Sequence, residues 1–268
     1  MHPAATALWR DVQRIRSKAP LVHNITNYVV MNFTANALLA AGASPVMAHA
    51  VDEVEDMVGI ASALVINIGT LSQPWVESMH VALRAAKRRG IPIVLDPVGS
   101  GATRYRTETV QSLLLAASPT VIRGNASEIR SLVHAERATR GVDSAHDTED
   151  ALDAARTLAR QHGCVVSVSG AVDMIVSADE VIRVSNGAPI MPKITGMGCA
   201  ASALTGAFTA VNDSPLQAAA HAMALNGIAG EMAAEQSRGP GTFHGAFIDS
   251  LYLIDEGDIE RRLRVNEA

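Results

Sequence analysis

The stretch that defines the fold runs from residue 64 to residue 97 and holds three segments. It begins with the apolar run LVINI (64–68), continues with the helical pattern QPWVESMHVALRAAKRR (73–89) and ends with PIVLDP (92–97). Basic residues in the last turn, followed by Gly90, are typical of a helix C-terminus. The two short apolar runs are typical of strands that are buried on both faces, as the strands of a parallel sheet are.

The same alternation continues on both sides of this stretch. Strand-like runs occur at 46–48, 120–125 and 165–170, and helical patterns occur at 107–117 and 148–162. Residues 173–184 predict an antiparallel hairpin at the sheet edge, and the chain after residue 198 is almost entirely helical to about residue 256. The sequence therefore predicts an α/β fold in one domain over residues 1–268, with a mainly parallel central sheet and helices on both faces. The polar residues 137–141 and 143–150 predict an insertion at the surface.

The composition restricts the class of protein and its partners. The chain has 268 residues, of which 48% are hydrophobic and 18% are charged, so it is expected to form a large globular core. Aromatic residues make up only 3%, which argues against single-stranded nucleic acid binding because that requires stacking platforms. The net charge of −5, without a long run of Lys or Arg, argues against any nucleic acid partner.

The cysteine content and the N-terminus suggest a cytoplasmic protein. Cys164 and Cys199 are the two cysteines, and neither belongs to a CxxC pair that would indicate a zinc site or a disulfide framework. The N-terminal residues lack the basic start and apolar run of a signal peptide. No uninterrupted apolar stretch reaches the roughly 18–20 residues that a membrane-spanning helix needs, so no membrane association is expected.

Polar residues gather where the predicted strands end. Asn67, Asp96, Arg123, Asn125 and Ser169 all stand at such positions, and parallel α/β sheets bind ligands beyond the carboxyl ends of their strands. The guanidinium of Arg123 suits a phosphate, because it can bind two of its oxygens at once. An ion pair between Arg123 and a surface carboxylate is the alternative.

Two carboxylates at this edge suggest a metal site. Asp96 follows four apolar residues, and Glu128 lies three residues after Asn125 at the start of the next helix. Carboxylates with few other ligands suit Mg²⁺ that is held mostly through water and phosphate oxygens. Alternatively, Asp96 caps a turn, and Glu128 forms a capping box with Asn125.

A glycine-containing run, KITGMGCAASAL (193–204), predicts a second functional element. Gly196 and Gly198 stand where a loop meets a helix of small apolar residues, and the free amides and dipole of such a helix start favour an anion. The same dipole is expected to lower the pKa of the Cys199 thiol. A glycine turn before a buried helix, with Cys199 as a small core residue, is the alternative.

The blocks VHNITN (22–27), LVINIGT (64–70), LDPVG (95–99), RGNASE (123–128) and TGMGC (195–199) together resemble hydroxyethylthiazole kinases of thiamine salvage, a branch of the ribokinase-like fold. The resemblance runs in order from about Leu21 to about Leu253. It implies a three-layer ribokinase-like architecture and Mg²⁺- and ATP-dependent phosphorylation of the hydroxyl of 4-methyl-5-(2-hydroxyethyl)thiazole. It also implies a homotrimer with pockets at the subunit boundaries.

The resemblance further implies roles for individual residues. Cys199 occupies the place where the wider fold carries an aspartate base, and it is the expected catalytic residue. The remaining expected contacts are Arg123, Ser169, Asn125 and Gly198 for ATP, Met47, Gly196 and Asn24 for the thiazole, and Asp96 and Glu128 for the metal. Ser169 and Met197 stand where the family often has threonine, so the first position keeps its hydroxyl and the second loses it.

Three other functions are compatible with parts of the sequence. A kinase for another small alcohol, such as a hydroxymethylpyrimidine, would fit an aspartate at position 199 better than Cys199. A hydrolase with a cysteine nucleophile would need a nearby histidine, which no sequence pattern supplies. A binding protein without catalysis would not need Asp96, Arg123, Glu128 and the glycine loop together.

Overall fold

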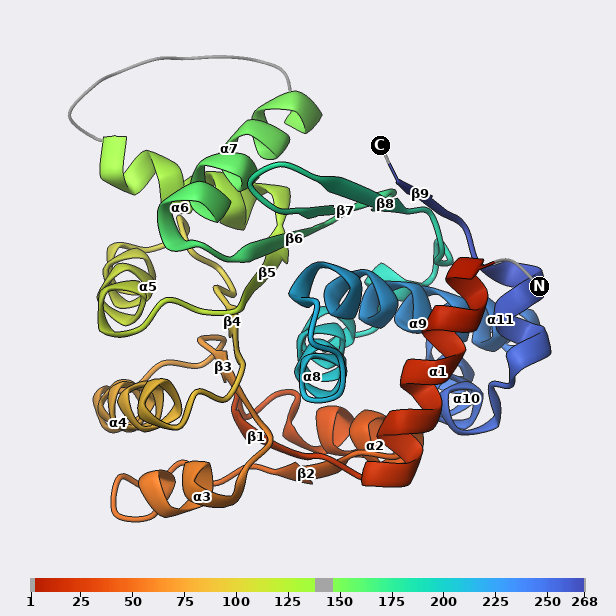
Figure 1. Ribbon diagram of the computed structural model, residues 1–268, viewed down its shortest axis with the longest axis horizontal. Coiled ribbons are helices and arrows are strands. Elements are labelled where there is room, and N and C mark those ends of the chain that lie inside the picture. Colours follow the sequence, from red (N-terminus) through yellow and green to blue (C-terminus); the bar gives the residue numbers. More distant parts are fainter. Residues whose placement is uncertain (1–2, 138–146, 268) are drawn as a thin grey trace.

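The computed structural model describes residues 3–137 and 147–267, which form a layered α/β fold (Figure 1). Its sheet has nine strands in the order β2-β1-β3-β4-β5-β6-β7-β8-β9. The first six in this order pair in parallel, and the last three pair antiparallel. The strands are β1 (Leu21–Ile25), β2 (Ser44–Val46), β3 (Ala63–Asn67), β4 (Ile93–Asp96), β5 (Val121–Asn125), β6 (Val165–Ser169), β7 (Asp173–Val176), β8 (Val181–Val184) and β9 (Val265–Glu267).

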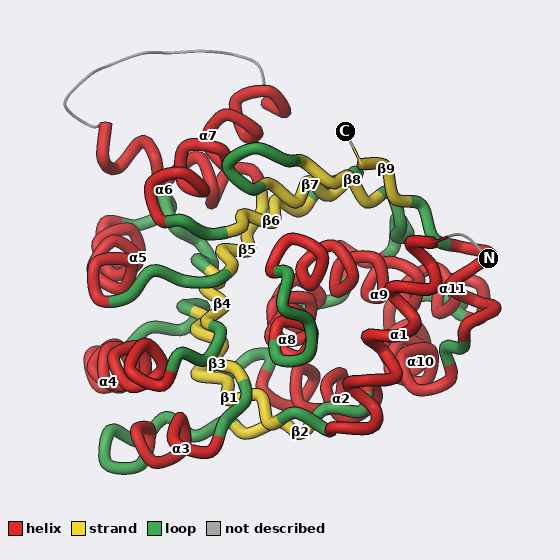
Figure 2. Tube along the Cα trace, in the orientation of Figure 1, coloured by secondary structure: helices red, strands yellow, loops and turns green. Residues whose placement is uncertain are grey.

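Helices cover both faces of this sheet, as Figures 1 and 2 show. One face carries α3 (Val54–Ile60), α4 (Gln73–Arg89), α5 (Arg104–Ala116), α6 (Ala126–Arg137) and α7 (Asp147–His162). The other face carries α2 (Met31–Ala41), α8 (Met197–Thr209) and α9 (Pro215–Gln236), with α1 (Pro3–Lys18), α10 (Pro240–Leu253) and α11 (Glu256–Arg262) farther out. The predicted three-layer arrangement with a mainly parallel sheet is therefore confirmed.

Side chains that alternate along each strand divide the interior into two cores. Leu64 and Ile66 of β3 pack toward the α4 side, whereas Val65 packs toward α8. Helix α8 approaches the sheet closely, because a β-carbon on Gly206 would lie 2.7 Å from Val65 Cγ2. The small residues of this helix therefore bring its N-terminal turn down to the carboxyl ends of the strands.

The other sequence predictions agree with the structure in most places. The hairpin over 173–184 forms from β7 and β8, and the residues from 199 to 256 are mostly helical, with short connections between α8, α9, α10 and α11. The helix expected at 107–117 begins earlier, at Arg104, because Thr103 caps it by accepting a hydrogen bond from the Arg106 amide. The predicted surface insertion lies mostly outside the described residues.

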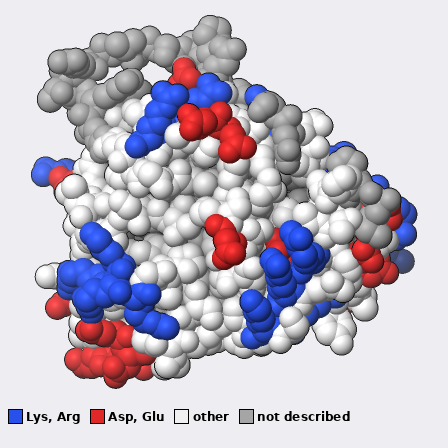
Figure 3. Space-filling view, viewed as in Figure 1, with Lys and Arg blue, Asp and Glu red and all other residues white. Residues whose placement is uncertain are grey.

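The distribution of charge on the surface and the length of the apolar helices are relevant to nucleic acid and membrane partners. On the face seen in Figure 3, the Lys and Arg side chains form separate groups, and Asp and Glu side chains lie beside several of them. Among the described residues, no helix is both long and apolar enough to cross a membrane.

Candidate active site

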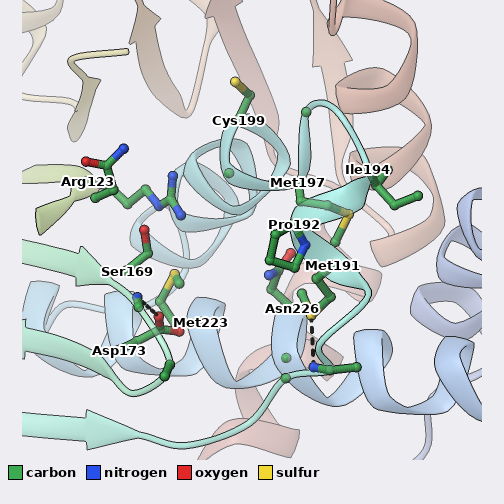
Figure 4. A pocket seen from close by; sticks show the side chains of 18 of the residues that line it. Arg123, Ser169, Asp173, Met191, Pro192, Ile194, Met197, Cys199, Met223 and Asn226 are labelled. Atoms are coloured by element: carbon green, nitrogen blue, oxygen red, sulfur yellow. Dashed lines mark hydrogen bonds between the residues drawn. The ribbon is translucent and has the colours of Figure 1, made fainter. Parts of the chain in front are cut away.

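A cavity of about 1090 Å³ opens beyond the carboxyl ends of β4, β5 and β6 (Figure 4). Its walls are the ends of these strands, the segment 185–198, the first turn of α8 and one side of α9. Eight of the predicted site residues line it: Asp96, Arg123, Asn125, Glu128, Ser169, Gly196, Gly198 and Cys199. Met47 and Asn24 do not line this cavity.

Gly196 and Gly198, the two glycines before Cys199, are each required for a different structural reason. Gly196 is the N-cap of α8 and has φ of +89°, a left-handed conformation in which a side chain would be strained. Gly198 faces Arg123, so that a β-carbon at this position would lie 2.6 Å from Arg123 Nη1. The absence of side chains lets the arginine lie against the start of the helix, where the free amides and the dipole already favour an anion.

Arg123 is the main cation of the cavity floor. Its side chain comes from β5 and projects between Ser169 and the first turn of α8 (Figure 4). The residue is only 8% exposed, and its Nε has no hydrogen-bond partner in the described part of the chain. A buried guanidinium with an unused donor, beside a helix N-terminus, is well suited to bind phosphate oxygens.

Asp96 is buried at the end of β4 and has one oxygen available. Its Oδ2 accepts hydrogen bonds from Asn67 Nδ2 at 2.8 Å and from Ser202 Oγ at 2.7 Å. Its Oδ1 is buried and has no hydrogen-bond partner among the described residues. Burial raises the pKa of this carboxyl to about 6, against the opposing effect of the Arg123 charge.

Cys199 is the third residue of α8, and its sulfur lies 3.6 Å from Asn27 Nδ2. The expected low thiol pKa is wrong: burial, together with the charge of Asp96, raises the pKa of Cys199 to about 11. Burial penalises the charged thiolate and the Asp96 carboxylate repels it, and both effects act against the helix dipole. At neutral pH this side chain is a protonated thiol.

Glu128 forms the capping box that the sequence offered as an alternative to a metal ligand. Its Oε2 accepts from the Asn125 amide at 2.8 Å, while its own amide donates to Asn125 Oδ1 at 2.9 Å. Its Oε1 accepts from the Gly99 amide at 2.9 Å. Across the described residues, no cluster of three or more His, Cys, Asp or Glu side chains could hold a metal on its own.

The structure adds residues that the sequence reasoning did not include. Asp173 at the start of β7 lines the cavity, accepts a hydrogen bond from the Gly170 amide at 3.0 Å, and has a pKa raised to about 6 by burial. Asn27 connects Cys199 to Asn67, to whose Oδ1 it donates at 2.9 Å. Asn226 and Met223 reach the cavity from α9. Of these residues, only Asn27 lay within a recognised block, VHNITN. Asp173 lay in the predicted hairpin, and the Ala-rich sequence of α9 offered no motif that would single out Asn226 or Met223.

Comparisons with known proteins agree on one family. The model of the hydroxyethylthiazole kinase family matches residues 12–257. A hydroxyethylthiazole kinase from Syntrophus aciditrophicus is 59% identical over 258 residues, which cover 96% of each chain. The solved structure of a hydroxyethylthiazole kinase protein from Pyrococcus horikoshii is 44% identical, covers 98% of this chain and 99% of its own, and superimposes with a TM-score of 0.91.

A more distant solved structure supports the fold alone. It is a ribokinase-like superfamily protein from Enterococcus faecalis, which is 15% identical and covers 88% of each chain with a TM-score of 0.64. The architecture is therefore ribokinase-like, as the sequence resemblance implied.

Proposed function

This chain belongs to the hydroxyethylthiazole kinase family, and we propose that it transfers the terminal phosphoryl group of ATP to the hydroxyl of 4-methyl-5-(2-hydroxyethyl)thiazole. The observation that carries the proposal is the contact between Arg123 and Gly198 at the start of α8, in a cavity that also contains Asp96 and Cys199. Phosphoryl transfer depends mainly on positioning and charge neutralisation, and this arrangement supplies both.

The nucleotide contacts follow from the cavity walls. The first amides of α8 and the Arg123 guanidinium bind the terminal phosphate oxygens, and they stabilise negative charge on the group in transfer. Asn125 and Ser169, from the ends of neighbouring strands, extend this polar wall. Ser169 Oγ donates to the Gly124 carbonyl at 3.4 Å, a long bond that the hydroxyl can exchange for a phosphate oxygen.

The acceptor alcohol binds on the Cys199 side of the cavity. The protonated thiol of Cys199 orients the hydroxyl toward the phosphoryl group, and Gly196, which lines the cavity, contacts the ring through its backbone. We place Met47 and Asn24 in the same subsite, although they do not line the cavity of the single chain. Met47 lies near a group of rings, since its carbonyl is 3.3 Å from His49 Nδ1, and His49 packs against Tyr28 and Trp75.

The residues present fit a Mg²⁺ ion. Asp96 offers Oδ1, a buried and unpartnered acceptor, and Mg²⁺ is usually held by one or two carboxylates with water and substrate phosphates. Glu128 would act beside it, through lone pairs that its two backbone contacts leave unused. The ion would neutralise charge on the phosphates during transfer.

We also propose that the whole chain forms one domain that assembles as a homotrimer in the cytoplasm. Tyr28 and Val29, each 64% exposed, follow directly after Asn27, which contacts Cys199. Leu39 on the neighbouring helix α2 is 58% exposed. Contiguous exposed apolar patches mark interaction surfaces, and Tyr28 and Val29 are next in the chain to a residue on the acceptor side of the cavity. A neighbouring subunit here would complete the thiazole subsite.

A product assay tests the proposed reaction. The protein is incubated with Mg-ATP and either the thiazole alcohol or a hydroxymethylpyrimidine, and products are identified by mass spectrometry. The expected result is one phosphate added to the thiazole alcohol, with little product from the pyrimidine. Phosphorylation of the pyrimidine alone would overturn the proposal.

A further inference from the structure

We infer that Asn67 is a positioning residue for the proposed reaction, because its one carboxamide holds both the acceptor side and the phosphoryl side of the cavity. It acts on Cys199 through Asn27, and it acts on Asp96 directly. The inference rests on the proposed function, since it assumes that Cys199 orients the alcohol and that Asp96 serves the phosphoryl group. It goes beyond that function by assigning the residue that keeps these two side chains in place relative to each other.

Asn67 stands at the end of β3, between the two strands whose ends carry its partners. In the sheet β3 lies between β1 and β4, and Asn67 is paired in register with Asp96 of β4 (Figure 1). Asn27 lies in the loop that follows β1. Neighbouring strands are only about 4.8 Å apart, so a side chain on the middle strand can reach both of its neighbours.

The hydrogen bonds of Asn67 use both ends of its carboxamide. Its Oδ1 accepts from Asn27 Nδ2 at 2.9 Å and from the Gly69 amide at 2.9 Å. Its Nδ2 donates to Asp96 Oδ2 at 2.8 Å. A backbone amide can only donate and an ionised carboxylate can only accept, so a rotated carboxamide would lose both of these bonds. The orientation of the Asn67 carboxamide is therefore fixed by its neighbours.

The contact toward Cys199 passes through Asn27, which is itself closely packed. Asn27 Nδ2 carries two hydrogens, and besides Asn67 it reaches the Cys199 sulfur at 3.6 Å. A β-carbon on Gly69 would lie 2.6 Å from Asn27 Cγ, so the backbone after β3 packs directly on this side chain. The sulfur therefore accepts from a donor that Asn67 holds, and the thiol hydrogen remains available for the alcohol.

The contact toward Asp96 shares its target oxygen with Ser202. Ser202 Oγ, on α8, donates to Asp96 Oδ2 at 2.7 Å. Donors from two different elements thus hold one carboxylate oxygen, while Oδ1 has no partner in the described part of the chain. Of these two donors, Asn67 is the one that also bonds Asn27.

A bridge at this position requires an acceptor at one end and a donor at the other, and a carboxamide supplies both. Transfer requires the alcohol and the phosphoryl group to be aligned, and a misplacement of about 1 Å can cost about 100-fold in rate. Loss of Asn67 should therefore affect both sides of the cavity. Loss of Asn27 or of Ser202 should directly affect only one.

A double-mutant cycle between Asn27 and Ser202 tests this bridge, with kcat/KM for the thiazole alcohol as the measurement. In the presence of Asn67, the loss in Asn27→Ala/Ser202→Ala should differ from the product of the two single losses by at least about threefold. In an Asn67→Ala background the two losses should simply multiply, because the link is gone. A coupling that persists without Asn67, or no coupling in its presence, overturns the inference.

Alkylation of Cys199 by iodoacetamide gives a readout that is independent of turnover. The rate is followed by peptide mass in the absence of nucleotide. Asn27→Ala and Asn67→Ala should change this rate in the same direction by about threefold or more, because each removes the donor that is held at the sulfur. Ser202→Ala should keep the wild-type rate. A wild-type rate in Asn67→Ala would overturn the inference.

Ser250→Ala is the matched control for Ser202→Ala. Ser250 is buried on α10 outside the cavity wall, and its Oγ donates to the Ala246 carbonyl at 2.7 Å. This variant should keep the wild-type kcat/KM, and it should show no coupling with Asn27→Ala.

Two further provisions keep the outcomes distinct. If Asn67→Ala fails to fold, as judged by its melting curve, Asn67→Ser takes its place, because serine is too short to reach both partners. A wild type that makes no thiazole phosphate with Mg-ATP would refute the proposed function. The alkylation rates would still report whether Asn67 acts on Cys199.

Discussion

Gly198 and Arg123 lie so close together that a side chain at position 198 would displace the arginine guanidinium. A β-carbon there would lie 2.6 Å from Arg123 Nη1 and 3.4 Å from its Cζ. The second glycine of the loop is thus required by a residue 75 positions earlier in the chain, which comes from the middle of the sheet. The pair brings a cation and the free amides of a helix start to the same place.

Gly198→Ala is therefore expected to displace the Arg123 guanidinium from the start of α8. Because the anion site loses its cation, kcat/KM for ATP should fall by at least about 100-fold, the range for loss of one preorganised group. Gly59→Ala is the matched control, since a β-carbon on Gly59 meets nothing within 4 Å. That control should keep its activity and melt at the same or a slightly higher temperature. Both variants are measured by steady-state kinetics, and a wild-type kcat/KM for ATP in Gly198→Ala would contradict this prediction.

Cys199 is expected to orient the alcohol as a neutral thiol, because burial raises the pKa of Cys199 to about 11. Cys199→Ala should lower kcat by about tenfold, as the loss of one orienting contact would. Its kcat should show the same pH dependence as the wild type between pH 7 and 9. Cys199→Asp should keep or raise kcat, because a carboxylate can accept the proton of the alcohol.

Cys164→Ala serves as the control for the thiol variants. Cys164 is buried outside the cavity, and this change should leave kcat unaltered. A phosphoryl adduct on Cys199, detected by intact-mass measurement during turnover, would instead indicate covalent catalysis.

Asp96→Asn is expected to stabilise the protein while it removes activity. The carboxyl pKa is about 6 in the folded chain, against an ordinary value of 3.8, because the group is buried. Between pH 4 and 6 the folded chain holds a proton that the unfolded chain has lost, so the free energy of unfolding falls as pH rises. Above pH 6 the asparagine variant should be more stable than the wild type by about 2–3 kcal/mol.

Urea unfolding at pH 4.5 and pH 8 checks this prediction. The stabilisation should be present at pH 8 and should shrink at pH 4.5, where the wild-type carboxyl is largely protonated in the folded chain. If Asp96→Asn is less stable than the wild type at pH 8, the prediction is contradicted. The hydrogen bonds and the Arg123 charge around Asp96 would then outweigh the cost of burying its carboxylate.

Val29→Arg combined with Leu39→Arg is expected to dissociate the proposed trimer. Both side chains are more than half exposed, and charges at a buried apolar interface are costly. The variant should elute as a monomer and should show a raised KM for the thiazole alcohol, because the subsite is no longer complete. Leu115→Arg, at an 89% exposed position on α5, is the control and should remain trimeric. Light scattering that finds an active wild-type monomer would refute the shared site.

Local sequence was sufficient to predict most of the strands and helices between residues 64 and 184 and their alternation, whereas β1 was not predicted and β2 lies at Ser44–Val46 rather than at 46–48. The runs at 64–68 and 92–97 are apolar because both faces of a parallel sheet are covered, and the pattern of 73–89 fits the helix α4 between them. Gly196 was recognisable because a positive φ before a helix has a local cause. Residues at strand ends, such as Asp96 and Arg123, were predictable because parallel strands end at the same edge of the sheet.

Only the tertiary structure decided the protonation state of Cys199 and which residues of α9 line the cavity. A helix start alone lowers a thiol pKa, but burial and the nearby Asp96 carboxylate reverse that effect. Asn226 stands in an Ala-rich helix without a recognisable motif, and its place in the cavity wall appears only in the structure, where α9 and the segment 185–193 line the same cavity. Secondary structure depends on interactions between neighbours in sequence, whereas desolvation and unpaired hydrogen bonds depend on which distant segments meet.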